Sequence, residues 1–283
     1  MDTRYDRNDD QIAAWNGPAA EQWIAHQAHM DILLAPVSEV LLGAAGIDRG
    51  MSIIDIGCGC GDTTLELSRR AGPSGQVLGL DISGPMLEWA RARAPAGLPV
   101  RFIEADATTY PFEANADLMV SRFGVMFFAD PTLSFTNMGK GLRPGGRIAF
   151  ACWREMHLCS WLTVPYEAAL QFVPRPADAP PDAPGAFALA DEAHVRDILG
   201  AAGFTGIAMR PVDLLLDLAA GRGLAAAIEC TLQIGPTSRL LADQPPAVRA
   251  PAIEAIGSAL RQFQLGDTVP LAGAIWIVTA TIA

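Results

Sequence analysis

A loop with glycine at every second position restricts the fold of this chain more than any other feature. Residues 55–61 read Asp-Ile-Gly-Cys-Gly-Cys-Gly; they close the apolar run 52–56 and precede the amphipathic stretch 63–71. Glycine adopts backbone conformations that other residues avoid, so a ligand can approach the main chain closely. A helix that follows directs free N–H groups at that ligand. Taken alone, such a loop can also be a purely structural turn between a strand and a helix.

The chain around this loop alternates short apolar runs with amphipathic segments. The runs predict strands at 52–56, 77–81, 100–104, 118–121, 147–152, 204–218 and 272–282. Helices are predicted between them at 63–71, 84–94, 133–142 and 191–202, and a turn at 144–146. Runs that are apolar throughout indicate strands buried on both faces. We therefore predict an α/β fold with a doubly wound, mostly parallel sheet and helices on both faces.

Helical segments precede and follow this core. Apolar spacing predicts two N-terminal helices within residues 11–45, separated by Gly17 and Pro18. Further helices are predicted at 153–173, 224–241 and 247–265, with a Pro- and Ala-rich loop at 174–184. We predict a single domain. Its parts are an N-terminal helical segment (1–45), a cofactor-binding core (46–152), a helical and Pro-rich insertion (153–203) and C-terminal strands with a helical cover (204–283).

Charge and composition restrict the classes of partner that this chain is expected to bind. The 283 residues carry a net charge of −11, and the 20 Lys and Arg residues form no basic stripe, which argues against a nucleic-acid partner. The charged first ten residues contain no signal-peptide core, and the longest apolar stretch, 269–283, is too short to span a membrane. We therefore expect a cytoplasmic monomer or homodimer that acts on a small molecule. The five cysteines are expected to be reduced, with Cys58 and Cys60 filling the tight loop, and no metal site is expected.

Two acidic positions follow the glycine loop in chain order. Asp81 ends the second predicted strand, 20 residues after Gly61. An acid at that position can accept hydrogen bonds from both ribose hydroxyls. Asp106 and Ala107 follow the third strand, where a carboxylate and a backbone N–H can bind an adenine ring. Together the three features predict an adenosine-containing ligand at the carboxyl edge of the sheet.

The glycine spacing discriminates between adenosine ligands. Dinucleotide-binding loops have the pattern G-x-G-x-x-G, whereas Gly57, Gly59 and Gly61 follow G-x-G-x-G. Where the dinucleotide pattern requires its third glycine, this chain has Asp62. An acid is poorly placed beside a pyrophosphate and better placed beside a ligand that carries an ammonium and a sulfonium. We therefore favour S-adenosylmethionine over NAD.

These segments, with Leu-Arg-Pro-Gly-Gly at 142–146, resemble the class I methyltransferases, most closely the ubiquinone/menaquinone-type and small-molecule group. The resemblance covers residues 51–152. It implies the strand order 3-2-1-4-5-7-6 with an antiparallel last strand. It also implies that Gly57 and Gly59 line the methionine part, with Ser121 and Arg122 flanking it, that Asp81 binds ribose, and that Asp106 and Ala107 bind adenine. The full predicted cofactor set is Asp55, Gly57, Cys58, Gly59, Gly61, Asp81, Ile82, Met86, Asp106, Ala107, Ser121, Arg122 and Phe123.

The sequence gives weaker evidence for the residues that bind the methyl acceptor. Aromatic faces stabilise a sulfonium, and we predict that aromatic residues near the site form the acceptor pocket. These are Trp15, Trp23, Phe127, Trp153 and Trp161; simple packing of the helices on the core is the alternative. His157, just after the fifth strand, is the one candidate for a catalytic base, with a surface or packing role as its alternative.

The functional prediction is transfer of a methyl group from S-adenosylmethionine, by in-line displacement, to oxygen, carbon or nitrogen of a small, fairly apolar metabolite. An NAD(P)-dependent oxidoreductase is one alternative. A non-catalytic S-adenosylmethionine-binding protein of the same fold is another. A nucleic-acid methyltransferase is disfavoured by the charge and because Ser-Arg-Phe-Gly at 121–124 departs from the Asn/Asp-Pro-Pro-aromatic pattern.

Overall fold

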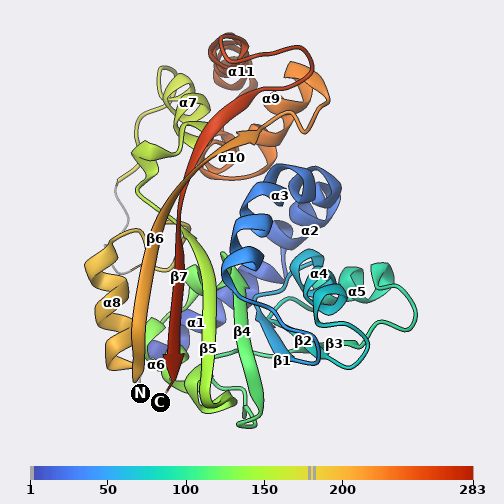
Figure 1. Cartoon of the computed structure of the whole chain (residues 1–283). Helices are drawn as coiled ribbons and strands as arrows, with labels where there is room; N and C mark the ends of the chain where they lie inside the picture. Colours follow the sequence, from blue (N-terminus) through green and yellow to red (C-terminus); the bar gives the residue numbers. More distant parts are fainter. Residues whose placement is uncertain (1–2, 178–179, 181–182, 283) are drawn as a thin grey trace.

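A computed structural model describes residues 3–177, 180 and 183–282 of the chain. These residues form a seven-stranded sheet in the order β3-β2-β1-β4-β5-β7-β6 (Figure 1). The strands are β1 Ser52–Ile56, β2 Gln76–Asp81, β3 Val100–Glu104, β4 Ala116–Arg122, β5 Leu142–Trp153, β6 Phe204–Asp217 and β7 Pro270–Ile282. The five strands β3, β2, β1, β4 and β5 pair in parallel in that order, whereas β7 runs antiparallel to both β5 and β6. The predicted strand order and the antiparallel last strand are confirmed.

Helices cover both faces of the sheet, as expected for strands that are apolar on both sides. Helices α3 (Gln27–Ala44) and α4 (Asp62–Ala71) pack on one face, and α6 (Pro131–Gly141) and α8 (Glu192–Ala201) pack on the other (Figure 1). Helix α5 (Gly84–Arg93) lies against β3. One continuous apolar core fills both layers, with Phe135 and Phe150 among its largest fully buried side chains.

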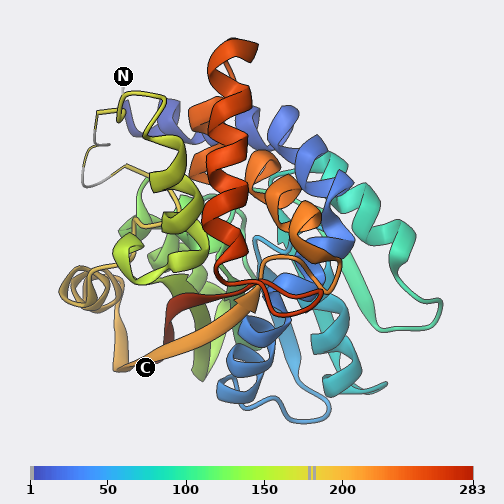
Figure 2. The same cartoon turned by 90° about the horizontal axis from the view of Figure 1, so that it is seen from above.

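A group of helices lies beyond the carboxyl ends of the parallel strands (Figures 1 and 2). Its C-terminal members are α7 (Ser160–Ala169), α9 (Gly223–Gln233), α10 (Pro236–Leu241) and α11 (Pro246–Arg261), which pack on one another. Helices α1 (Thr3–Trp15) and α2 (Pro18–Ala25) precede α3 on the N-terminal side. Within the part of the chain that the structure describes, no helix is long and apolar enough to cross a membrane.

Several predicted boundaries need correction. The N-terminal segment holds three helices, because a further break at His26 separates α2 from α3. The helix predicted at 153–173 is α-helical only over Ser160–Ala169, since β5 continues to Trp153, where it pairs with Ile275 of β7. Pairing between distant strands therefore overrides the local helical pattern.

Two further corrections involve glycine. The helix predicted at 224–241 is two helices, because Gly235 has a φ of 90° and Pro236 begins α10. The turn predicted at 144–146 lies within β5 as an irregularity in the pairing: Leu142 pairs with Ala116, and the next pair is Arg147 with Leu118. The intervening residues of β5 therefore loop out of register.

A buried carboxylate joins the first strand to the helix that follows it. Asp55 is 1% exposed, and the Thr64 hydroxyl donates a hydrogen bond of 2.6 Å to its Oδ2. Burial raises the pKa of Asp55 to about 7, against 3.8 for an ordinary aspartate. Because the unfolded chain releases this proton at lower pH than the folded chain does, the contribution of Asp55 to stability decreases as pH rises from about 4 to 7.

We predict that Asp55→Asn removes this pH dependence, because the amide does not titrate. The free energy of unfolding of the variant minus that of the parent therefore increases from pH 5 to pH 7 and then levels off, because the parent loses stability over this range. Urea unfolding at several pH values measures it. A difference in stability between the two proteins that stays constant across this range would contradict the raised pKa. The size of a constant difference reports only how well the amide fits the site.

Candidate active site

A cavity of about 600 Å³ opens at the carboxyl edge of the sheet, beside the glycine loop. This volume lies within the usual range for small-molecule sites. The part of the cavity formed by the loops after β1, β2 and β3 is called the strand end. The part formed by α7, α9, α10 and the connection between α9 and α10 is called the helix end. Residues of α1, α2 and α3 complete the wall.

The glycine loop approaches a second glycine at the strand end. Gly57 has a φ of 65°, and a Cβ there would lie 2.7 Å from the Cα of Gly124. A Cβ on Gly124 would in turn lie 2.8 Å from the Cα of Gly57. Two main chains therefore pass each other without side chains, which leaves the loop's backbone open to a ligand in the cavity.

Asp81 fixes the loop from the neighbouring strand. Its Oδ2 accepts a hydrogen bond from Gly59 N–H at 2.7 Å and its Oδ1 accepts one from Ser83 N–H at 2.8 Å. The side chain is nearly buried, and burial raises its pKa, although the backbone donors at Ser83, Gly59 and Ile82 oppose the change. Each carboxylate oxygen has more than one acceptor site, so Asp81 can hold the loop and also accept from a ligand hydroxyl.

The N-terminal helices attach to the loop after β2 through Asn16. Its Nδ2 donates to Ile82 O at 2.9 Å, and its Oδ1 accepts from Gly84 N–H at 3.0 Å. Asn16 lies in the connection between α1 and α2, next to Gly17. The start of the chain is therefore anchored beside Asp81, where it closes one side of the cavity.

The segment after β3 provides a further polar position. Asp106 and Ala107 both line the strand end. Asp106 Oδ1 accepts from Thr108 N–H at 2.8 Å, and the Asn137 amide donates to Ala107 O at 3.0 Å. Helix α6, which carries Asn137, therefore orients this segment from the far side.

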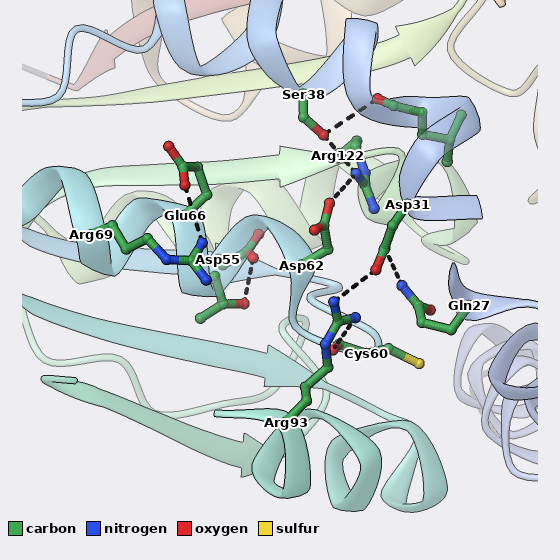
Figure 3. A network of polar contacts seen from close by, with 12 residues as sticks. Gln27, Asp31, Ser38, Asp55, Cys60, Asp62, Glu66, Arg69, Arg93 and Arg122 are labelled. Atoms are coloured by element: carbon green, nitrogen blue, oxygen red, sulfur yellow. Dashed lines mark hydrogen bonds and ion pairs between the residues drawn. The ribbon is translucent and has the colours of Figure 1, made fainter. Parts of the chain in front are cut away.

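Asp62 is neutralised by an arginine. Arg122 donates to Asp62 Oδ2 at 2.8 Å and to Ser38 Oγ at 2.6 Å, which joins β4, α4 and α3 (Figure 3). The sequence argument that a free acid at this position selects a cationic ligand is therefore not supported, because the charge already has a partner. The choice of cofactor has to rest on other observations.

A second ion pair links α3 to α5 in the same network (Figure 3). Arg93 donates to Asp31 at 2.7 Å, and Gln27 donates to the other carboxylate oxygen of Asp31. Burial raises the pKa of Asp31, the Asp62 charge raises it further, and the Arg93 contact lowers it. Helix α3 is thus fixed at two points around the glycine loop.

Aromatic rings form much of the remaining wall. Trp15 meets Phe127 edge to face with centroids 5.3 Å apart, and it also contacts Trp23. Phe123 stacks on Trp153 at 4.3 Å, and Trp153 contacts Trp161 at 5.2 Å. All six side chains line the cavity. They connect the N-terminal helices, the segment after β4 and α7 into one apolar surface.

Most of the predicted site residues meet at this cavity. From the cofactor set, ten line it: Gly57, Cys58, Gly59, Asp81, Ile82, Met86, Asp106, Ala107, Arg122 and Phe123. All five predicted acceptor-pocket residues line it as well: Trp15, Trp23, Phe127, Trp153 and Trp161.

Four predicted residues lie outside the cavity lining. Asp55 bonds Thr64 behind the loop, and the Ser121 hydroxyl donates to Ile56 O at 2.8 Å. A Cβ on Gly61 would meet Ala90 at 2.9 Å, so this glycine serves packing beneath α5. His157 is exposed in the 3-10 turn Met156–Leu158 and is absent from the cavity wall, so the geometry gives no support to it as a base.

The cavity offers little for proton abstraction. Among the described residues that line it there is no His, Lys or Tyr. Cys58 and Cys60 line it, but burial raises the pKa of the Cys60 thiol to about 12 and that of Cys58 well above its ordinary value. Both therefore remain thiols at neutral pH. The three carboxylates of the wall, Asp62, Asp81 and Asp106, each accept a hydrogen bond from the protein, so the surroundings favour chemistry that needs no protein base.

Sequence reasoning missed the residues that come from distant helices. Asn16, Gln27, Gln233, Ser238 and Arg239 belong to this group; all but Asn16 line the cavity. None lies in a motif, and only the tertiary fold brings them to the carboxyl edge of the sheet. Asn16 had a weak local signal, since it stands beside the predicted break at Gly17 and Pro18.

Comparison with known proteins agrees with this geometry. Residues 53–146 match a family described as methyltransferase domain. Demethylmenaquinone methyltransferases of Staphylococcus aureus are 35% identical over 104 residues, which is 36% of this chain and 43% of the relative. The match thus spans less than half the length of these curated relatives.

Solved structures share the fold. The YcgJ protein of Bacillus subtilis aligns over 87% of this chain and 97% of its own, with a TM-score of 0.56 and 14% identity. Phosphoethanolamine N-methyltransferase 2 of Haemonchus contortus, solved with phosphomonomethylethanolamine and S-adenosylhomocysteine, aligns over 87% of this chain and 52% of its own, with a TM-score of 0.52 and 19% identity. Residues 53–146 are thus similar to a methyltransferase domain, and the sheet has the Rossmann-like arrangement of the solved structures.

We predict that Gly57→Ala lowers the free energy of unfolding by about 1–3 kcal/mol, because the new Cβ meets the Gly124 main chain at an unfavourable φ. Gly43→Ala is the matched control: a Cβ in this helical position meets nothing within 4 Å, so the variant should be neutral or up to about 1 kcal/mol more stable. Urea unfolding of both variants tests the contact, and equal stabilities would contradict it.

Proposed function

We propose that this chain is an S-adenosylmethionine-dependent methyltransferase that acts on a small, fairly apolar acceptor. One observation carries the proposal: the Asp81 carboxylate and the side-chain-free backbone at Gly57 and Gly59 share one cavity, within a segment that matches methyltransferase domains. Bound S-adenosylmethionine supplies an electrophilic methyl group on a sulfonium. The cytoplasmic location and the monomer or homodimer predicted from the sequence remain part of this proposal.

The roles of the residues follow from their positions. Asp81 accepts from the ribose hydroxyls, while the loop at Gly57 and Gly59 lies against the methionine part. Asp106 and Ala107 bind the adenine ring, and Ile82 and Met86 pack against the nucleoside. The aromatic wall excludes water and presents ring faces that stabilise a positive charge. Catalysis then rests on orienting the acceptor for in-line displacement and on keeping the site dry.

We expect an acceptor that is nucleophilic without help from a protein base, because the described cavity wall holds no His, Lys or Tyr and protein donors already bond its three carboxylates. A carbon nucleophile, an amine or an oxygen that is already ionised meets this condition. The Staphylococcus aureus relatives are named for demethylmenaquinone, which makes a quinol-type acceptor one candidate. The matched family segment, 53–146, leaves out α7, α9 and α10, so the acceptor bound at the helix end does not follow from the family match.

The first test is calorimetric titration with S-adenosylmethionine, S-adenosylhomocysteine and NAD in parallel. We expect micromolar binding of the first two and no binding of NAD. Binding of NAD alone would overturn the proposal in favour of an oxidoreductase. A non-catalytic binding protein would bind the first two but release no S-adenosylhomocysteine with any member of an acceptor panel.

We predict that Asp81→Asn weakens binding of S-adenosylhomocysteine by about 1–3 kcal/mol, or roughly 5- to 150-fold, because one ribose hydroxyl loses a charged acceptor. Asp48→Asn serves as the matched control, since Asp48 is exposed and outside the cavity wall. Thermal unfolding of both variants separates a loss of binding from a loss of fold. An unchanged affinity in folded Asp81→Asn would remove Asp81 from the site.

A further inference from the structure

We propose that the helix end of the cavity recognises an anionic oxygen group on the methyl acceptor, and that Arg239 is the residue that binds it. This inference rests on the proposed function, because it names the class of acceptor. It concerns walls that lie outside the segment matched by the methyltransferase family.

Arg239 belongs to the C-terminal helices that close the cavity. It lies on α10, which packs against α7 and α9 beyond the strand ends (Figure 1). Arg239, Ser238 and Gln233 line the cavity together with Trp161 of α7. Helices α9 and α10 therefore bring polar side chains to an otherwise apolar wall, to which α7 adds an aromatic ring.

The charges in the cavity are unevenly distributed. Its charged lining residues are Asp62, Asp81, Asp106, Arg122 and Arg239. Arg122 is paired with Asp62, and the acidic residues belong to the strand end. Among the described residues, none forms a hydrogen bond or ion pair with Arg239, and no carboxylate lines the helix end. Arg239 is thus a cation that faces the cavity without a protein counter-charge.

Neighbouring groups at this end also lack partners. Arg239 keeps a solvent-exposed surface. Partial desolvation lowers its pKa, with an opposing contribution from Tyr166, and the guanidinium remains charged at neutral pH. The Gln233 side chain has no hydrogen bond to any described residue. The Trp161 indole N–H is buried without an acceptor. An anionic oxygen in the cavity would replace water as the partner of the Arg239 guanidinium with a charge-assisted hydrogen bond.

The geometry of a guanidinium narrows the class of anion. Its planar fork matches a carboxylate through two parallel hydrogen bonds. A single arginine balances one negative charge, whereas a phosphate dianion would retain uncompensated charge against apolar walls. Trp153, Leu162 and Ile234 provide an apolar surface for the rest of the molecule. The acceptor class is therefore an apolar organic monoanion: a carboxylate, or the ionised oxygen of an acidic phenol or enol.

The test uses matched probes on protein saturated with S-adenosylhomocysteine. Benzoate, 2-naphthoate and octanoate are each titrated beside the corresponding neutral amide, and 4-nitrophenol is titrated below and above its own pKa. We expect at least one anion to bind about tenfold or more tightly than its neutral partner. A preference for the carboxylates alone, or for ionised 4-nitrophenol alone, distinguishes the two sources of the anionic oxygen.

Variants assign the preference to Arg239. Arg239→Gln should remove it and leave the affinity of the amides unchanged, whereas Arg239→Lys should retain part of it. Arg261→Gln is the matched control, because Arg261 is exposed on the same group of helices and outside the cavity wall. Thermal unfolding confirms that each variant is folded.

Two results would overturn the inference: no anion preferred over its neutral partner, or a preference that persists in folded Arg239→Gln. Failure of S-adenosylhomocysteine to bind the parent protein is a different result, since it overturns the proposed function. An anion preference that depends on Arg239 would then still establish the anion site.

Discussion

The carboxylate of Asp81 is the interaction on which the site depends, because it connects the second strand to the glycine loop. Gly59 can turn its N–H toward that carboxylate only because its φ is 52°, which glycine adopts without strain. The same loop can pass Gly124 only because neither residue has a Cβ. Burying a carboxylate is costly, and the backbone donors that hold Asp81 offset that cost. The loop and the acid therefore stabilise each other before any ligand binds.

The N-terminal helices depend on this arrangement in turn. Asn16 bonds the loop after β2, and Asp31 of α3 holds Arg93 of α5. A small apolar cluster of Ala20, Cys60 and Met86 joins α2 to the glycine loop and α5. The helices that cover the strand end are thus attached to the residues that form it. A ligand at Asp81 and the position of α1 and α2 are expected to be coupled for this reason.

The parts of the fold that could be predicted are those with a local physical cause. Strands such as Ser52–Ile56 follow from apolar runs, and the glycine loop follows from backbone freedom; both causes are visible in a few residues. Boundaries set by distant partners could not be predicted: β5 extends to Trp153 because it pairs with β7, and no local pattern reports this. The pairing of Asp62 with Arg122, 60 positions apart, removed one argument from charge for the cofactor, because that argument assumed an isolated acid. The single-domain boundaries remain a prediction.

The two ends of the cavity differ in how strongly the sequence determines them, and the difference has a physical origin. The strand end has to position fixed chemistry, so its glycines and acids occur at fixed places after strands and can be found by spacing. The helix end has only to present a surface, and many helix sequences can do so. Arg239 and Gln233 carry no motif, because their position relative to the cavity depends on the break at Gly235 and on packing against α7. A related core can therefore be paired with a different helix end, and acceptor specificity has to be argued from the cavity walls of each protein rather than from the core that they share.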